Sequence, residues 1–269
     1  MKFLAMMLAM AAVAAHGAPP PPESVRVYVM DCGKLSVEDP SRFNFKKEEL
    51  KRLDMSVGCY FIVHPKGTLM WDSGVIPDGA APTLQYAATT KPLRAQLQAA
   101  GYTPQDANYF ALSHYHWDHI GNANQFAGAN WLVRKVERDM MLAGTSDSRY
   151  PAHYSELKNS KFTIIDTDDY DVFGDGTVVI KFTPGHTPGH QVLYLKLAKT
   201  GPLLITGDLY HYPEELTVPR VPNNDVDKPA TLKSRAMLQA FAKQAGAKIW
   251  IQHDLATFEK LKKAPAFYE

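Results

Sequence analysis

The 269-residue sequence predicts an α/β layered fold in one domain over residues 24–269, and three observations support it. Apolar strand-like runs alternate with amphipathic helical segments in two similar halves, which is typical of sheets covered by helices. The composition, 45% hydrophobic and 21% charged, is enough to bury a substantial core. Polar motifs follow several predicted strands directly, and sites in α/β folds tend to lie at such ends.

The first half of the domain begins with strands. The stretch "HPKG" between two of them has the Pro and Gly of a hairpin turn. Leu93 and Leu97, four residues apart before a glycine, predict a short amphipathic helix over 91–101. Segment 130–144 begins as a strand and continues as a helix. The predicted strands of this half cover residues 25–31, 58–65, 67–74 and 107–114.

The second half repeats the alternation. A helix is predicted over 228–246, ended by Gly246, and a final helix over 256–263. The predicted strands cover residues 161–166, 177–185, 190–197, 202–208 and 248–252. The apolar stripe expected to face the core from the longer helix is Leu232, Leu238, Phe241, Ala242 and Ala245.

The N-terminus predicts export. Lys2 precedes an apolar run that ends in small residues, the pattern of a secretory signal cleaved near Gly17 or Ala18. The alternative is an uncleaved anchor, although the run is shorter than the roughly 20 residues that a span needs. We expect a signal peptide over 1–18, a proline-rich lead-in over 19–23, and a periplasmic or secreted mature protein without stable membrane insertion.

The net charge indicates which partners to exclude, and the cysteine content raises the question of a disulfide. A formal net charge of +1 argues against a nucleic-acid partner, since phosphate contacts need a basic surface. An oxidising compartment allows Cys32 and Cys59 to form a disulfide. Both lie in predicted strands, however, where a buried reduced cysteine is equally ordinary, and we expect them to be unpaired. The oligomeric state stays open.

The stretch "SHYHWDH" at 113–119 carries the strongest chemical signal. In extended or turn geometry His114 and His116 project to the same side, and Asp118 and His119 are then expected to begin a helix. One peptide can therefore offer ligands to two adjacent metal ions. Imidazole nitrogen and carboxylate oxygen suit Zn²⁺, with other divalent transition metals as alternatives.

Three further ligands are predicted at strand ends elsewhere in the chain. His186 lies on a Gly/Pro turn, and Asp208 and His253 follow apolar strands. Alone, each has a structural explanation, such as an N-cap for Asp208, but the cluster at 114–119 favours ligation. His190 is expected to support the site without binding metal. The predicted set is His114, His116 and His186 on one ion, Asp118, His119 and His253 on the other, and Asp208 bridging both.

Four motifs of the chain, taken in order, resemble those of the metallo-β-lactamase superfamily. They are "SHYHWDH", "TPGHTPGH" at 183–190, "TGD" at 206–208 and "QHD" at 252–254. The resemblance covers essentially the whole mature chain. It implies a four-layer αββα sandwich with a two-metal site at one edge of the sheets. It also implies that Asp72, in "WDSG", supports the site without binding metal.

Within the superfamily the chain is most similar to N-acyl-homoserine lactone lactonases. Asp208 argues against β-lactam hydrolysis, because the true β-lactamases resemble each other in having Cys or Ser at this point. The resemblance therefore implies a quorum-quenching hydrolase that binds two Zn²⁺ and opens a small-molecule lactone by attack of a metal-bridging hydroxide. The alternatives are β-lactam hydrolysis, another ester hydrolase, and a metal-binding protein without activity.

One departure from the lactonase pattern concerns the group that stabilises the oxyanion. The lactonases carry a Tyr three residues after the bridging Asp, where this chain has His211 between Tyr210 and Tyr212. All three are candidate donors. Asp208 or Asp118 is the candidate that passes a proton to the leaving alkoxide. For an apolar acyl tail, the candidate pocket residues are Phe43, Phe45 and Leu50, which fit a plain core role equally well.

Overall fold

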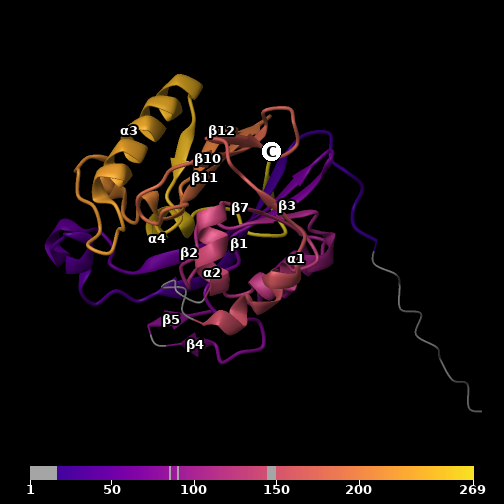
Figure 1. The fold of residues 1–269 in the computed structure, drawn as a ribbon, viewed down its shortest axis with the longest axis horizontal. Coiled ribbons are helices and arrows are strands. Elements are labelled where there is room, and N and C mark those ends of the chain that lie inside the picture. Colours follow the sequence, from indigo (N-terminus) through magenta and orange to yellow (C-terminus); the bar gives the residue numbers. More distant parts are fainter. Residues whose placement is uncertain (1–16, 85, 90, 144–149) are drawn as a thin grey trace, which may run out of the picture.

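The computed structural model describes residues 17–84, 86–89, 91–143 and 150–269, which form two sheets (Figure 1). The nine strands of the larger sheet are β1 (Arg26–Leu35), β2 (Met55–His64), β3 (Gly67–Trp71), β4 (Thr83–Leu84), β5 (Ala87–Ala88), β6 (Tyr109–Ala111), β7 (Asn130–Val133), β8 (Phe162–Ile164) and β14 (Phe267–Tyr268). The five strands of the smaller sheet are β9 (Asp169–Asp171), β10 (Val178–Phe182), β11 (Gln191–Leu197), β12 (Gly201–Ile205) and β13 (Lys248–Trp250).

The larger sheet has the strand order β4-β5-β1-β2-β3-β6-β7-β8, with β14 beside β1, and the smaller has β13-β12-β11-β10-β9. Strands β3, β6, β7 and β8 run parallel to one another, as do β12 and β13. The helices are α1 (Leu93–Ala99), α2 (Lys135–Ala143), α3 (Lys228–Ala245) and α4 (Leu255–Phe258). Short 3₁₀ turns include η1 (Pro40–Phe43), η2 (Lys47–Glu49), η4 (Ala123–Phe126), η7 (Gly207–Leu209) and η8 (Pro213–Leu216).

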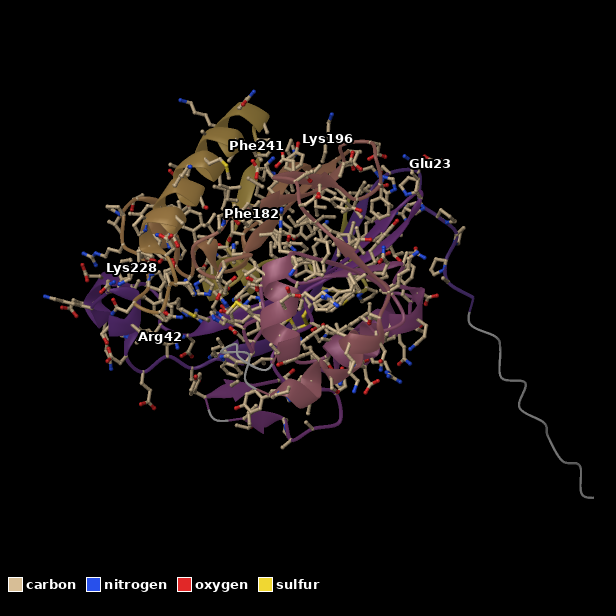
Figure 2. All side chains as sticks on the ribbon, in the orientation of Figure 1. Glu23, Arg42, Phe182, Lys196, Lys228 and Phe241 are labelled. Atoms are coloured by element: carbon tan, nitrogen blue, oxygen red, sulfur yellow. A yellow bond between two sulfur atoms is a disulfide. The ribbon has the colours of Figure 1, made fainter. Side chains whose placement is uncertain are left out.

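Three buried clusters show how the layers stack. One joins the larger sheet to α1 and α2, the second lies between the two sheets, and the third joins the smaller sheet to α3. In Figure 1, α3 covers one side of the molecule and α1 and α2 lie on the other, and the side chains of Figure 2 fill the space between. Representative members, in that order, are Phe61 with Leu97, Ile62 with Leu193, and Leu204 with Leu238. This layering confirms the predicted four-layer αββα sandwich.

Helix α3 has the predicted length but a different buried face. Asp227 caps its first turn by accepting from the Ala230 N–H, and Gly246 ends it at a φ of 64°. Leu238 and Ala242 are buried as expected, whereas Leu232 is 39% exposed. The helix instead buries Arg235. The predicted apolar stripe was partly wrong, because this face of the helix contacts the loop of Leu209 and Glu215 through the polar side chain of Arg235.

Two expectations near the site are also corrected. Asp118 and His119 lie in a turn rather than in a helix, because the His119 carbonyl accepts from the backbone and hydroxyl of Ser73. The final helix covers only Leu255–Phe258, shorter than the segment 256–263 that we expected. After Phe258 the chain tightens into turns, with the Lys260 N–H donating to the Thr257 carbonyl, and the Lys262 N–H then donates to the Tyr268 hydroxyl.

The two cysteines form a disulfide, so the expectation of unpaired cysteines was wrong. Cys32 and Cys59 have sulfur atoms 2.05 Å apart and Cα atoms 5.9 Å apart. They lie on the adjacent antiparallel strands β1 and β2, whose register shifts between Asp31 and Lys34. Strand register is not visible in the sequence, and it is the register that brings the two side chains within bonding range.

The predicted signal peptide over 1–18 falls almost wholly on residues 1–16, which lie outside the described residues. Within the described ranges, none of the helices combines the length and the apolar character needed to cross a membrane.

Candidate metal centre

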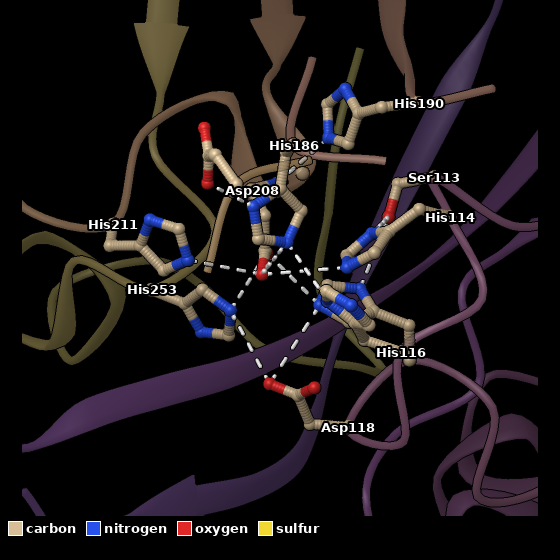
Figure 3. A network of polar contacts seen from close by, with 12 residues as sticks. Ser113, His114, His116, Asp118, His186, His190, Asp208, His211 and His253 are labelled. Carbon is tan, nitrogen blue, oxygen red and sulfur yellow. Dashed lines mark hydrogen bonds and ion pairs between the residues drawn. The ribbon is translucent and has the colours of Figure 1, made fainter. Parts of the chain in front are cut away.

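The loops that follow β6, β10, β12 and β13 bring the seven predicted ligands together (Figure 3). The ligating atoms of each group lie within 4.8 Å of one another. One group is His114, His116, His186 and Asp208, and the other is Asp118, His119, Asp208 and His253. The geometry therefore reproduces both expected sets, including the shared carboxylate.

Asp208 lies between the two groups and offers one oxygen to each. Its Oδ2 is 3.5 Å from the Nε2 of His114 and 3.3 Å from that of His186. Its Oδ1 is 3.0 Å from the Nε2 of His119 and 2.9 Å from that of His253. This division is the arrangement that a bridging carboxylate needs to bind two cations at once.

Buried polar atoms at the centre test whether the residues fit metal ions. The Nε2 atoms of His114 and His119 and the Oδ1 of Asp208 are buried, and although they lie at ion-pair distance from their neighbours they form no hydrogen bond with any described residue. Leaving such atoms unsatisfied is costly, and most buried polar atoms in folded proteins have a partner. Two divalent cations would satisfy all three atoms, and the nitrogen and oxygen donors suit zinc.

Asp72, at the end of β3, fixes the ring of His119. One carboxylate oxygen is 2.9 Å from the His119 Nδ1 and accepts from the Gln252 side-chain amide at 2.8 Å. The other accepts from the Ser113 backbone N–H at 2.6 Å. Asp72 has a φ of 56°, a left-handed conformation that Asp tolerates better than most residues. This is the supporting role that the resemblance implied.

His114, His186 and His253 each contact a neighbouring residue through Nδ1, which leaves Nε2 to face the centre; for His114 the partner is the Ser113 hydroxyl at 3.0 Å. Asp225 holds His186 at 2.7 Å, and the Ser56 carbonyl holds His253 at 2.7 Å. His190, expected to support the site, accepts from the backbone N–H of Asp208 at 3.0 Å. The roles of Asp225 and Ser56 could not be predicted from the sequence, because each lies far along the chain from the histidine it holds.

The protonation of the cluster follows from burial and from the carboxylates. Burial, with the neighbouring imidazoles, lowers the pKa of His114 and His116 well below the ordinary range. Burial also opposes the charged form of His186, but Asp208 and Asp225 outweigh it and raise its pKa to about 9. Metal ligands must be neutral imidazoles, so a cation that binds here displaces a proton.

Glu137 of α2 is a buried carboxylate that the sequence analysis missed. It accepts from the backbone N–H of Tyr115 at 3.0 Å and from that of Gly189 at 2.7 Å. Tyr115 lies between two ligands, and Gly189 follows the His186 turn. One side chain therefore joins the two ligand loops. Burial raises the pKa of Glu137 to about 7, from an ordinary 4.5.

We expect Glu137 to make the protein less stable as pH rises. The folded protein keeps this proton up to about pH 7, whereas the unfolded chain loses it near 4.5, so stability falls across that window. The full effect is about 3 kcal/mol in the free energy of unfolding. Urea unfolding between pH 5 and 8 should show this slope in wild-type protein and its loss in Glu137→Gln. Asp139→Asn, an exposed carboxylate of the same helix, should keep it. Parallel curves for wild type and Glu137→Gln would contradict the assignment.

A small pocket opens onto the centre. The insert between β1 and β2, residues 36–54, contributes Phe43 to its wall. Phe45 and Leu50 are buried in the core next to the larger sheet and do not line it. The remaining lining residues are Leu35, Arg42, Met55, His116, Trp117, Asp118, His186, Asp208, His211, Asn224 and His253.

The three candidate oxyanion donors separate clearly in the structure. The Nε2 of His211 is 3.2 Å from the Oδ2 of Asp208, and the ring lines the pocket (Figure 3). The hydroxyl of Tyr210 points to the Arg235 carbonyl at 3.5 Å. That of Tyr212 donates to the Leu53 carbonyl at 2.8 Å. The two tyrosine candidates are therefore set aside, and His211 is the candidate donor.

The loop that carries His211 is held by the buried pair of Glu215 and Arg235. Glu215 accepts from the backbone N–H groups of His211 and Tyr212, and the Arg235 guanidinium contacts its other oxygen at 2.9 Å. Arg235 also donates to the Leu209 carbonyl at 2.7 Å. These contacts explain why α3 buries Arg235, and they turn the tyrosine rings away from the pocket.

Known proteins similar to this chain belong to a family of metal-dependent hydrolases, in agreement with a metal centre at this position. Residues 54–253 match the model of the metallo-beta-lactamase superfamily. The N-acyl homoserine lactonases AttM of Azorhizobium caulinodans and of Agrobacterium fabrum are both 31% identical, over 91% of this chain and 99% and 98% of theirs. A solved quorum-quenching N-acyl homoserine lactone lactonase has a TM-score of 0.76 at 26% identity, covering 91% of this chain and 98% of its own.

The match, the fold and the paired ligand groups together show that the chain belongs to the metallo-β-lactamase superfamily. Within that superfamily it is a metal-dependent hydrolase whose curated relatives are N-acyl homoserine lactonases. The family expected from the sequence is thus confirmed.

Proposed function

We propose that the protein opens the lactone ring of N-acyl-homoserine lactones and so degrades quorum signals. The observation that carries the proposal is the pair of ligand groups that share Asp208. Curated lactonases at 31% identity that align over 91% of the chain support the same substrate class. An aspartate at the bridging position favours a lactone over a β-lactam.

We propose two Zn²⁺ ions as the resident metals, because five imidazoles and two carboxylates suit this ion. Bound there, the ions would supply a water of lowered pKa and polarise the lactone carbonyl. The chain's own residues do the rest. Asp72, Asp225 and the Ser56 carbonyl orient the ligand rings.

His211 faces the pocket beside Asp208 and can donate a hydrogen bond to the oxyanion that forms on ring attack. Burial lowers its pKa, so the ring is neutral and carries one proton to donate. Asp208, or Asp118 beside it, is the candidate that takes the proton released by the attacking water and passes it to the alkoxide that leaves as the ring opens. The product is the ring-opened hydroxy acid.

A substrate panel tests the proposal. Zinc-loaded protein should hydrolyse N-hexanoyl-homoserine lactone, releasing one proton per turnover, far faster than it hydrolyses a chromogenic β-lactam or a simple aryl ester. Wild-type protein stripped with a chelator should lose this activity and recover it with added Zn²⁺. Faster turnover of the β-lactam would replace the lactone assignment and leave the metal centre in place. An absence of turnover on all three substrates would support a metal-binding protein without activity.

We also propose that the protein acts outside the cytoplasm, on the strength of Lys2, the apolar run to Ala15 and the proline-rich lead-in. Mature protein from the native host should begin near Ala18 and fractionate with the periplasm or the medium. N-terminal sequencing of that protein provides the measurement. An intact Met1 on a cytosolic protein would show that the segment is not a cleaved signal.

A further inference from the structure

The pocket wall carries a cation without a counter-ion. Arg42 lies on the insert, is exposed to solvent and lines the mouth of the pocket. Its guanidinium lies over the Phe43 ring, 4.4 Å from the centroid, and forms no ion pair or side-chain hydrogen bond with any described residue. Other arginines close by are paired: Arg52 with Glu259 at 3.1 Å and Arg220 with Glu49 at 2.8 Å.

A chain of ring contacts places Arg42 relative to the metal centre. The Phe43 ring lies 4.8 Å from the ring of His211, measured between centroids. His211 in turn lies beside the bridging carboxylate of Asp208. The guanidinium is therefore one aromatic layer away from the candidate oxyanion donor. A substrate arm that leaves the metal centre along Phe43 would therefore meet this guanidinium.

The backbone at Arg42 is fixed, so its position in the wall is a built feature. Asp39 caps η1 by accepting from the Ser41 N–H at 2.9 Å, and Asn44 ends the turn at a φ of 61°. The Arg42 carbonyl accepts from the Asn223 N–H at 2.7 Å, and the Asn44 amide donates to the Val221 carbonyl at 2.7 Å. Figure 2 shows Arg42 on the side of the molecule where α3 begins.

The segment that anchors Arg42 also contributes to the pocket. Asn224 follows Asn223 and lines the same wall, and its side-chain amide bonds to no described residue. Asp225, the next residue, holds the metal ligand His186. The pocket wall therefore contains two polar side chains, the cation of Arg42 and the amide of Asn224. Their segments are joined by a backbone hydrogen bond, and Asp225 joins the second segment to His186.

We propose that Arg42 is a specificity-determining residue that binds a carbonyl oxygen on the acyl arm of the lactone. This inference rests on the proposed function. A guanidinium has only donors, so an acceptor must replace the water that a bound arm displaces from it. An amide or oxo carbonyl supplies that acceptor, and a plain alkyl arm does not. The pocket should therefore favour lactones with a carbonyl next to the ring over alkyl lactones of equal size.

Two substrates and three variants test this inference. The substrates are N-hexanoyl-homoserine lactone, which has an amide carbonyl in its arm, and α-heptyl-γ-butyrolactone, whose arm of equal length leaves the ring at the same carbon and has none. Arg42→Met keeps an apolar side chain beside Phe43 and removes the charge. It should lower kcat/KM for the acyl lactone about 10-fold, mainly through KM, and change that for the alkyl lactone less than about 2-fold. Arg42→Lys should recover part of the loss.

Arg52→Met is the matched control, because Arg52 lies on the same insert but pairs with Glu259 and does not line this pocket. It should leave both substrates unchanged. An equal loss on both substrates in Arg42→Met, or no loss on either, would overturn the inference while the lactonase function stands. A wild-type protein that opens neither lactone would overturn both.

Discussion

Replacing Asp208 with alanine is expected to abolish activity almost completely, by on the order of 10³-fold or more in kcat. Its two oxygens divide between the two ligand groups, so this one change removes a ligand from each metal. It would also leave Asp118 as the one carboxylate of the proposed ligand set, so two bound dications would repel each other more strongly.

Metal analysis separates this effect from a misfolded protein. Carefully reconstituted wild-type protein should contain two transition-metal ions per chain, and Asp208→Ala at most one. His116→Ala, which changes only one ligand group, should also lose one ion and most of the activity. Asp169→Ala, an exposed carboxylate that pairs with Lys181, should keep both ions and full activity. Wild-type protein that holds less than one ion after reconstitution would refute the two-metal centre.

The second large effect is expected at His211. Removing one oxyanion donor typically lowers kcat by about 10²-fold, and His211→Ala should show a loss of this size with little change in KM. Tyr210→Phe and Tyr212→Phe should change kcat less than about 3-fold, because their hydroxyls contact the carbonyls of Arg235 and Leu53 instead of the pocket.

The comparison needs metal content as a second readout, since His211 lies beside the bridging carboxylate. A variant that keeps two ions and loses kcat has lost a donor, whereas a variant that loses an ion has lost a support of the centre. Unchanged kcat in His211→Ala would show that the metals alone stabilise the oxyanion. A loss confined to either tyrosine variant would return the role to that residue.

The sequence predicted which side chains would gather at the centre, because each of them follows a recognisable local pattern. His114 and His116 are two residues apart in an extended segment, and Asp208 and His253 end apolar strands, so parallel neighbours bring them to one edge. The four-layer arrangement rested on the resemblance, and the three buried clusters then showed it in the structure.

What could not be predicted depends on contacts between distant segments. The disulfide follows from the register of β1 on β2, and the role of Glu137 follows from where α2 lies against two loops. The buried face of α3 is set by the ion pair of Arg235 with Glu215. The three candidate donors are adjacent in sequence, and only the anchoring of their loop distinguishes them.

The disulfide between Cys32 and Cys59 closes the insert into a covalent ring. The two cysteines are 27 positions apart, and the whole insert, with Arg42 and Phe43, lies between them. A cross-link of this span removes about 3–4 kcal/mol of chain entropy from the unfolded state in the loop-closure description. The wall of the pocket is thus a macrocycle joined to the sheet at both ends. When the noncovalent contacts of the insert break, the disulfide limits how far the segment can move from the metal centre. The native contacts can therefore form again quickly.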